Sequence, residues 1–290
     1  MGGEKSPPTC EFYLKMKNSD QEKFLREKAN QIRREVISVA VANGAGHIAP
    51  SLSCVDILVA LYYGVMKYDA QNPGWEGRDR LIFSKSHGCY ALYAILADMG
   101  LIPQKIWQGL YQPSNPLSGC AERKPDWGIE AGCGSLGHGL PIAVGVALGA
   151  SLQNKSYHTF CVVGDGELQE GTTWEAVQFA VKHGLDNLTI IVDNNHLQAM
   201  DFVVNVLDRK ENEFIARLEG FGLSCVECPG HAASQLAETI RESFSMRNDG
   251  PGVVVAETTK GYGLSCMENV PKFHFRIPTE QEMREGILHE

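Results

Sequence analysis

The sequence has no apolar run long enough to cross a bilayer, which would require about 20 consecutive residues. Its first residues also lack the pattern of a secretory signal peptide, so we expect a cytoplasmic protein that does not insert into a membrane. Positive charge is scarce, because 26 Lys and Arg residues stand against 35 Asp and Glu residues, for a net charge of −9. Nucleic-acid binding depends on Lys and Arg that neutralise phosphates, and we therefore expect no nucleic-acid partner.

A regular cysteine framework is also absent. The nine cysteines are odd in number and scattered, as is typical of reduced thiols in a cytosolic enzyme. Cys225 and Cys228 have CxxC spacing, which leaves a redox or zinc site as one interpretation. They fall in a predicted strand, however, where positions three apart face opposite sides, and the sequence has no second pair. Two unconnected thiols are therefore the favoured interpretation.

Internal repeats and long linkers are lacking too, so we expect a single domain over residues 20–290 after a flexible leader over residues 1–19. Hydrophobic periodicity predicts helices over residues 20–42, 51–66, 90–99, 140–152, 173–182, 214–221 and 235–246. Short apolar runs predict strands over residues 80–84, 160–163, 188–192, 223–228 and 253–257. Strands that alternate with helices in this way indicate an α/β fold with a doubly wound, mainly parallel sheet flanked by helices.

Two of the predicted strands stop at side chains that carry oxygen ligands. The run over residues 160–163 is followed by Gly-Asp-Gly, and the run over residues 188–192 is followed by Asp-Asn-Asn. Ligands of doubly wound sheets bind beyond the carboxyl ends of the strands. The Asp165 carboxylate, the Asn195 amide oxygen and the backbone carbonyl of Leu197 would suit Mg²⁺, or Ca²⁺ or Mn²⁺ in its place.

The same strand end has features of a diphosphate site. Gly166 has no Cβ, so its backbone can approach a phosphate closely. The helix predicted after Gly171 would direct its positive end toward the same anion. The alternative is that both loops are only turns, for which Gly, Asp and Asn are favoured residues. The presence of two such loops after two apolar strands favours the binding site.

The combination resembles the thiamin diphosphate signature, in which Gly-Asp-Gly is followed some thirty residues later by Asn, here Asn195. Further segments narrow the resemblance to the transketolase family, and to the subunit of split enzymes that carries the diphosphate-binding half. The matching segments are Gly46-His47, Ser84 to Gly88, Gly128 to Glu130, Gly134 to Leu140 and Met267 to His274. The resemblance extends from about residue 20 to residue 278, and it implies the thiamin diphosphate-binding fold of a PP domain.

The resemblance implies roles for several residues. His87 and His274 would lie near the cofactor diphosphate and the reacting oxygens of the substrate, and His47 would contact a substrate hydroxyl or carbonyl. Imidazole suits these roles because it exchanges protons near neutral pH. Glu170 corresponds to a glutamate between the two active sites of a dimer that takes part in proton sharing. The residues that would line the cofactor are Gly134, Ser135, Leu136, Gly166 and Glu167.

Two positions depart from the family pattern. Cys120 stands where a histidine is expected to contact the donor hydroxyl group, and a thiol is a weak hydrogen-bond partner. His196 follows the metal-binding Asn, where glycine is common. The first departure puts the standard sugar-phosphate specificity in doubt, although not the ketol-transfer chemistry itself.

Nothing in the chain corresponds to the pyrimidine-binding domain, which supplies the glutamate that polarises the cofactor in this family. The resemblance therefore implies a partner, namely a C-terminal transketolase-like subunit in an α₂β₂ complex that transfers a two-carbon ketol unit. A thiamin-dependent acyl transferase or decarboxylase with a pyruvate-type donor remains an alternative, because such a donor would not need the missing histidine. A non-catalytic regulatory subunit is a further alternative. A nicotinamide dehydrogenase is disfavoured, since no Gly-x-Gly-x-x-Gly joins a strand to a helix.

Overall fold

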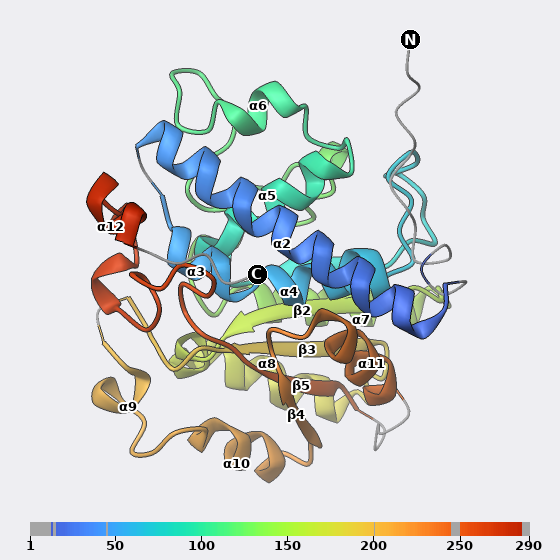
Figure 1. Cartoon of the computed structure of the whole chain (residues 1–290). Coiled ribbons are helices and arrows are strands. Elements are labelled where there is room, and N and C mark those ends of the chain that lie inside the picture. The colour runs from blue at the N-terminus through green and yellow to red at the C-terminus, as the bar shows by residue number, and fades with distance from the viewer. Residues whose placement is uncertain (1–12, 14–15, 45, 200, 245–249, 286–290) are drawn as a thin grey trace.

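A five-stranded sheet forms the centre of the computed structural model, which describes residues 13, 16–44, 46–199, 201–244 and 250–285 (Figure 1). The strands are β1 (Arg80–Phe83), β2 (Thr159–Gly164), β3 (Leu188–Asn194), β4 (Cys225–Pro229) and β5 (Gly252–Glu257). Their order in the sheet is β1-β2-β3-β5-β4, and all neighbouring pairs run parallel. All five carboxyl ends therefore lie on one edge of the sheet.

Helices cover both faces of this sheet. The core on one face includes α2 (Asn18–Asn43), α3 (Ile48–Ser53), α4 (Val55–Val59), the π-helical turn η1 (Ala60–Val65), α5 (Cys89–Asp98) and α11 (Ala233–Ser243). The core on the other face includes α7 (Gly139–Leu152), α8 (Gly171–Lys182) and α10 (Glu213–Gly220). Figure 1 shows α7 and α8 behind the sheet and α2 and α11 in front of it. The predicted doubly wound α/β fold is confirmed.

Short elements lie in the connections. They are α6 (Gln104–Gln108), α9 (Val203–Val206), α12 (Glu280–Glu285) and the 3₁₀ turns η2 (Ser86–Gly88), η3 (Pro125–Trp127), η4 (Gly166–Gln169) and η5 (Pro271–Phe273). Over residues 117–137, for which the sequence predicted neither a helix nor a strand, the structure has η3 and an isolated bridge between Lys124 and Ile129. The sequence could not reveal these turns, because they are too short to show a hydrophobic period.

The strand sequences reflect burial on both faces. Every residue of β2 and β3 is buried, which explains their nearly continuous apolar character. The edge strand β4 has exposed positions, and its two cysteines diverge as predicted. Cys228 belongs to the core on the α2 side, whereas Cys225 packs against the core on the α7 side. Both thiols are free, and their divergence leaves no support for a CxxC site.

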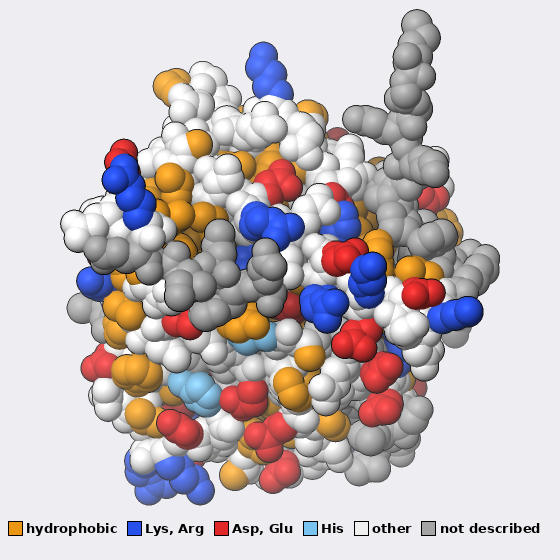
Figure 2. Space-filling model, in the orientation of Figure 1, with side chains coloured by type: hydrophobic (Ala, Val, Ile, Leu, Met, Phe, Trp, Pro, Cys, Tyr) orange, Lys and Arg blue, Asp and Glu red, His pale blue; other side chains and the backbone are white. Residues whose placement is uncertain are grey.

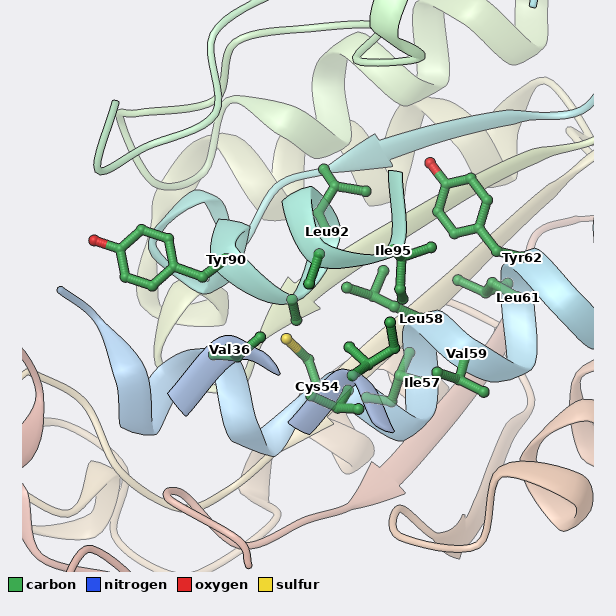
Figure 3. Packing of buried hydrophobic residues seen from close by; sticks show 14 of the residues in the cluster. Val36, Cys54, Ile57, Leu58, Val59, Leu61, Tyr62, Tyr90, Leu92 and Ile95 are labelled. Atoms are coloured by element: carbon green, nitrogen blue, oxygen red, sulfur yellow. The ribbon is translucent and has the colours of Figure 1, made fainter. Parts of the chain in front are cut away.

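The larger core fixes the segments that carry functional loops. Figure 3 shows Val36 of α2, Leu58 of α4 and Ile95 of α5 in this core, and all three side chains are fully buried. Replacement of a leucine packed in this way by alanine typically costs about 2–5 kcal/mol. Because α3 and η2 contact each other and α5, the core holds the two loops that lead into them in fixed positions.

One predicted helix differs from the structure. The helix expected over residues 51–66 is divided into α3, α4 and η1, with a break at Cys54, where φ is −101° and ψ is 6°. Apolar residues continue across this break and all are buried, so periodicity could not show it. The predicted end of the first helix is confirmed, because Gly44 has a φ of 72° and donates its N–H to the carbonyl of Ala40 at 3.1 Å.

Most of the predicted leader, residues 1–19, lies outside the described residues. In the described part, Tyr13 is buried and α2 begins at Asn18. No helix within the described ranges combines the length and the apolar character that a membrane span needs. On the face shown in Figure 2, acidic and basic side chains are interspersed. Exposed pairs such as Lys23–Glu27 add little to stability.

Candidate active site

The carboxyl edge of the sheet carries the predicted site. The loops that leave this edge carry Lys85 after β1, Asp165 after β2, Asn195 after β3 and Lys260 after β5. Ligands of open α/β sheets bind outside this edge, where the loops separate. The fold therefore gathers residues that are far apart in the sequence into one region.

Asp165 and Asn195 lie on neighbouring strand ends, as predicted. The Asp165 carboxylate accepts hydrogen bonds from the backbone N–H groups of Gly166 at 2.7 Å and His196 at 2.5 Å. The Asn195 amide oxygen accepts one from the N–H of Leu197 at 3.1 Å. Burial, and then the charge of Asp193, raises the pKa of Asp165 to about 6.

These residues fit a hard cation better than a soft metal. The predicted donors are a buried carboxylate, an amide oxygen and a backbone carbonyl, which are the oxygen ligands that Mg²⁺ prefers. In the part of the chain that the structure describes, no group of three or more His, Cys, Asp or Glu side chains could hold a metal. A divalent cation would also favour the charged form of Asp165, which burial disfavours.

Asp193 has a different place from its neighbour Asn195. It is fully buried, and its carboxylate forms an ion pair with Lys85. The Ser53 hydroxyl donates to the same carboxylate at 2.7 Å, and the Thr258 hydroxyl donates to its other oxygen. A buried charge requires this degree of pairing. Asp193 therefore joins the ends of β1, β3 and β5 and does not face a ligand.

The three histidines singled out from the sequence converge. The ring centroids of His47 and His274 are 5.2 Å apart, those of His87 and His274 are 5.1 Å apart, and those of His47 and His87 are 6.0 Å apart. They come from the loop before α3, from η2 and from the residue after η5. Separations of 40 and 187 residues along the chain give no hint of this contact.

All three imidazoles are neutral at neutral pH. Burial, and then the charge of Lys260, lowers the pKa of His274 to about 3. Burial, followed by the charge of Lys85, lowers the pKa of His87 well below its usual range, and burial also lowers the pKa of His47. Neutral imidazoles can donate and accept hydrogen bonds at the same time, which suits a site that moves protons between oxygens.

Lys260 belongs to the site and was not predicted. Its ammonium group is buried and donates to the carbonyl of Gln198 at 2.5 Å and to Nδ1 of His274 at 3.0 Å. Among the described carboxylates, none forms a salt bridge with it. Burial, and then the charge of Lys85, lowers the pKa of Lys260 to about 7. A buried cation in this state is suited to an anionic ligand. In the sequence, the feature that could have identified Lys260 as a site residue is its position just after the last strand.

Glu167 fixes the loop that contains the predicted cofactor-lining residues. It is 2% exposed, and its carboxylate accepts hydrogen bonds from the N–H groups of Gly137 at 2.9 Å and Gly164 at 3.2 Å, and from the Ser84 hydroxyl. Gly137 has a φ of 78°, and a Cβ there would lie 2.6 Å from that of Glu170, so glycine is required. Glu167 therefore supports the loop that contains Gly134, Ser135 and Leu136 through its hydrogen bond to Gly137.

The residues around this loop are accessible. Gly134 and Ser135 are exposed, Leu136 is half-buried, and Glu170 is exposed at the start of α8. Cys120 borders the same loop, because a Cβ built on Gly134 would lie 3.9 Å from the Cβ of Cys120. The thiol that replaces an expected imidazole therefore stands beside predicted cofactor-lining residues.

The second departure from the family pattern has a structural explanation. His196 has a φ of 60°, a conformation that glycine adopts more readily than other residues. Its imidazole Nε2 lies 3.0 Å from the carboxylate of Glu257. The hydrogen bond to Glu257 raises the pKa of His196. This contact with Glu257 stabilises histidine at a position where the backbone favours glycine.

Comparison with known proteins places this geometry in a family. The family described as "Transketolase, thiamine diphosphate binding domain" matches residues 25–285. The chain is 38% identical over 261 residues to an apulose-4-phosphate transketolase subunit of Actinobacillus succinogenes, covering 89% of this chain and 93% of that protein. It is 33% identical to the 6-deoxy-6-sulfo-D-fructose transketolase subunit SqwG of a Clostridium species, covering 93% of this chain and 97% of that protein.

Longer transketolases match over part of their length. Human transketolase is 33% identical, and the match covers 93% of this chain but 43% of that protein. The solved transketolase of Campylobacter jejuni superposes with a TM-score of 0.81 at 28% identity, covering 91% of this chain and 42% of that one. The chain thus spans less than half the length of these enzymes. It belongs to the transketolase family and contains the thiamin diphosphate-binding domain of that family.

Proposed function

We propose that this chain is the N-terminal, cofactor-binding subunit of a cytoplasmic split transketolase-like enzyme, which transfers a two-carbon ketol unit from a donor to an aldehyde acceptor. The observation that carries the proposal is the convergence of His47, His87 and His274 beside a buried lysine and a pair of oxygen ligands at one sheet edge. A fold retained only for structure would not require three half-buried neutral imidazoles in contact.

The carboxyl edge of the sheet would hold the cofactor through its diphosphate. Asp165, Asn195 and the carbonyl of Leu197 would bind Mg²⁺, or Ca²⁺ or Mn²⁺ in its place, and the cation would be shared with phosphate oxygens. The backbone of Gly166 and the ammonium group of Lys260 would contact the same anion. When it is bound, thiamin diphosphate supplies the nucleophilic carbon that breaks and forms carbon–carbon bonds.

The histidines would hold and move protons at the reacting oxygens. When Lys260 is charged it can only donate, so Nδ1 of His274 accepts from it. The proton of this imidazole is then on Nε2 and can be donated to a ligand oxygen. His47 Nδ1 is buried without a hydrogen-bond partner among the described residues, and a substrate hydroxyl or carbonyl would satisfy it. The ring of His87 contacts the rings of His47 and His274, and His87 would complete the path by which protons move among the three.

A second polypeptide would complete the active site. Several relatives of similar length are named as subunits of a transketolase rather than as whole transketolases, which supports a partner for this chain as well. We infer that the partner is a C-terminal transketolase-like subunit with a pyrimidine-binding domain, in an α₂β₂ complex. Glu170 is exposed at the start of α8, where a neighbouring chain can reach it for proton sharing.

Cys120 supports a second candidate function. A pyruvate-type donor presents a methyl group where a ketose presents a hydroxymethyl group, and a thiol tolerates a methyl group better than an imidazole donor would. The chain would then serve a thiamin-dependent acyl transferase or decarboxylase. The position of Cys120 beside Gly134 keeps this candidate open. A regulatory subunit that has lost catalysis has no comparable observation in its favour.

The test is reconstitution. The chain is co-expressed with candidate pyrimidine-domain subunits and supplied with thiamin diphosphate, Mg²⁺ and a panel of ketose phosphates and 2-oxo acids. We expect turnover only with a partner, and the active donor class separates the two candidates. Turnover by the chain alone would overturn the split-enzyme proposal. Failure of the chain to bind thiamin diphosphate with Mg²⁺, with or without a partner, would overturn the cofactor assignment.

A further inference from the structure

We propose that His231, which lies outside the predicted site, is a positioning residue for Lys260. The imidazole Nε2 of His231 accepts a hydrogen bond from the backbone N–H of Thr259 at 2.7 Å. Thr259 is bonded directly to Lys260, whose ammonium group contacts His274. The inference rests on the proposed function in so far as Lys260 binds the cofactor diphosphate, and it adds a residue that controls the geometry of that contact.

The hydrogen bonds of His231 define its protonation. A backbone N–H can only donate, so Nε2 of His231 carries no proton and Nδ1 carries one. Nδ1 lies 3.3 Å from the carboxylate of Asp56, which can accept that proton. Asp56 also accepts from the guanidinium group of Arg33 at 2.5 Å. This arrangement fixes both the tautomer and the orientation of the ring, as carboxylates commonly do for functional histidines.

Packing holds the His231 ring in the same orientation. It stacks on the ring of Tyr262 with a centroid separation of 3.5 Å and an interplanar angle of 8°. The guanidinium carbon of Arg33 lies 4.8 Å from the centroid of the same tyrosine. A cavity of about 170 Å³ borders these side chains, so close packing alone does not hold them. The hydrogen bonds and the ring stacking of His231 also keep the loop that contains Lys260 in place.

The backbone of the loop is anchored on either side of Lys260. The N–H of Thr258 donates to the carbonyl of Asn194 at 3.0 Å, and the N–H of Gly261 donates to the carbonyl of Ala49 at 3.0 Å. The bond from Thr259 to His231 is the anchor next to Lys260 that comes from a side chain. The carbonyl of Thr259 also accepts from the N–H of Tyr262 at 3.1 Å, and the carbonyl of Lys260 accepts from the N–H of Asn269 at 2.9 Å. Loss of the His231 bond would therefore release the peptide that joins Thr258 to Thr259, and rotation of this peptide would shift the ammonium group of Lys260 relative to His274.

The first test needs no ligand. We compare the ring nitrogen resonances of His274 by ¹⁵N NMR in the full chain, in the His231→Phe variant and in the His158→Phe control. Phe keeps the stacking surface and removes the acceptor. His158 also packs against aromatic rings, Phe160 at 4.7 Å and Phe244 at 4.8 Å, but it precedes β2 at the opposite edge of the sheet. We expect the His274 resonances to shift in His231→Phe and to stay in place in the control.

The second test is a double-mutant cycle with thiamin diphosphate and Mg²⁺ as the probe, measured by calorimetry. His231→Phe should weaken binding about five- to tenfold, the effect of losing one hydrogen bond. In the Lys260→Met background the same substitution should have no further effect, because coupled residues are not additive. His231→Gln, whose amide oxygen can accept from Thr259, should recover part of the affinity.

Each outcome decides one question. Unchanged His274 resonances in His231→Phe, or an equal loss of affinity with and without Lys260, would overturn the positioning role. If the unmodified chain does not bind thiamin diphosphate, the proposed function is wrong, and the NMR comparison still decides the role of His231.

Discussion

The ammonium group of Lys85 and the carboxylate of Asp193 form a fully buried ion pair that ties the end of β1 to the end of β3. The lysine is also within hydrogen-bond distance of the Pro50 carbonyl at 3.0 Å and the Ser53 hydroxyl at 2.7 Å. Burial opposes the charged form of Lys85, but the surrounding groups, of which Asp193 has the largest effect, together outweigh burial and raise the pKa of Lys85. The loops of the site depart from strand ends that this pair joins.

Removal of this lysine should therefore be costly. We expect Lys85→Met to lower the free energy of unfolding by about 3–5 kcal/mol, because it leaves Asp193 buried without its cation. The measurement is chemical denaturation followed by circular dichroism. Lys155→Met is the control, since it removes an exposed lysine that pairs with Glu76 at 2.8 Å, and it should leave the midpoint unchanged. Equal midpoints for both variants would contradict the structural role.

The metal assignment gives a second prediction. Asp165→Ala removes the carboxylate of the predicted cation site, and binding of thiamin diphosphate should lose its dependence on Mg²⁺ and weaken at least about a hundredfold, as expected when a charged ligand to a bound ion is lost. Titration calorimetry at several Mg²⁺ concentrations measures both effects. Asp186→Ala, an exposed carboxylate in the turn before β3 at the opposite edge, is the matched control and should bind normally. Undiminished affinity in Asp165→Ala would show the assignment to be wrong.

The sequence predicted the elements that repeat a simple physical pattern. Apolar strands that end in Asp165 and Asn195 could be recognised because ligands gather at the carboxyl edge of a parallel sheet. Neighbouring positions with similar chemistry could not be told apart in this way. Asp193 and Asn195 both follow an apolar run, and only the packing of Lys85 against the first shows that it is an internal partner rather than a ligand.

Long-range contacts were beyond sequence reasoning. The three histidines were identified through resemblance to a family, and nothing in their spacing required that His47 and His274 meet at 5.2 Å. Lys260 was missed because a lysine after a strand usually extends into solvent, and its burial depends on His274 and on the loop that contains Gln198. The role of Glu167 at the cofactor stays a prediction, and the hydrogen bond that its carboxylate accepts from the N–H of Gly137 could not be read from the sequence.

The neutral histidines predict how stability depends on pH. The pKa of His274 is about 3 in the folded chain, below its ordinary value of 6.5, so the unfolded chain binds the proton more readily. Stability from this group is therefore fully present above pH 6.5 and is lost as the pH falls from 6.5 toward 3. Urea denaturation at pH 7.5, 6.5 and 5.5 measures the free energy of unfolding. As the pH falls, this free energy should decrease less in His274→Asn than in the unmodified chain. Parallel losses in the two proteins would contradict a half-buried His274 that stays neutral in the folded chain.

The donor site gives the last prediction. Cys120 borders the loop of Gly134, where the family pattern expects an imidazole that contacts a donor hydroxyl group. In the complex with its partner, Cys120→His should raise kcat/KM for ketose phosphates relative to 2-oxo acids by about five- to tenfold, the effect of one added hydrogen bond. Cys120→Ser and Cys266→Ser, the latter on a half-buried free thiol outside this loop, are the controls. The serine hydroxyl at position 120 should produce a smaller change in the same direction, and Cys266→Ser should produce none. If Cys120→His left the ratio of the two donor classes unchanged, position 120 would not contact the donor, and the specificity of the enzyme would have to come from its partner chain.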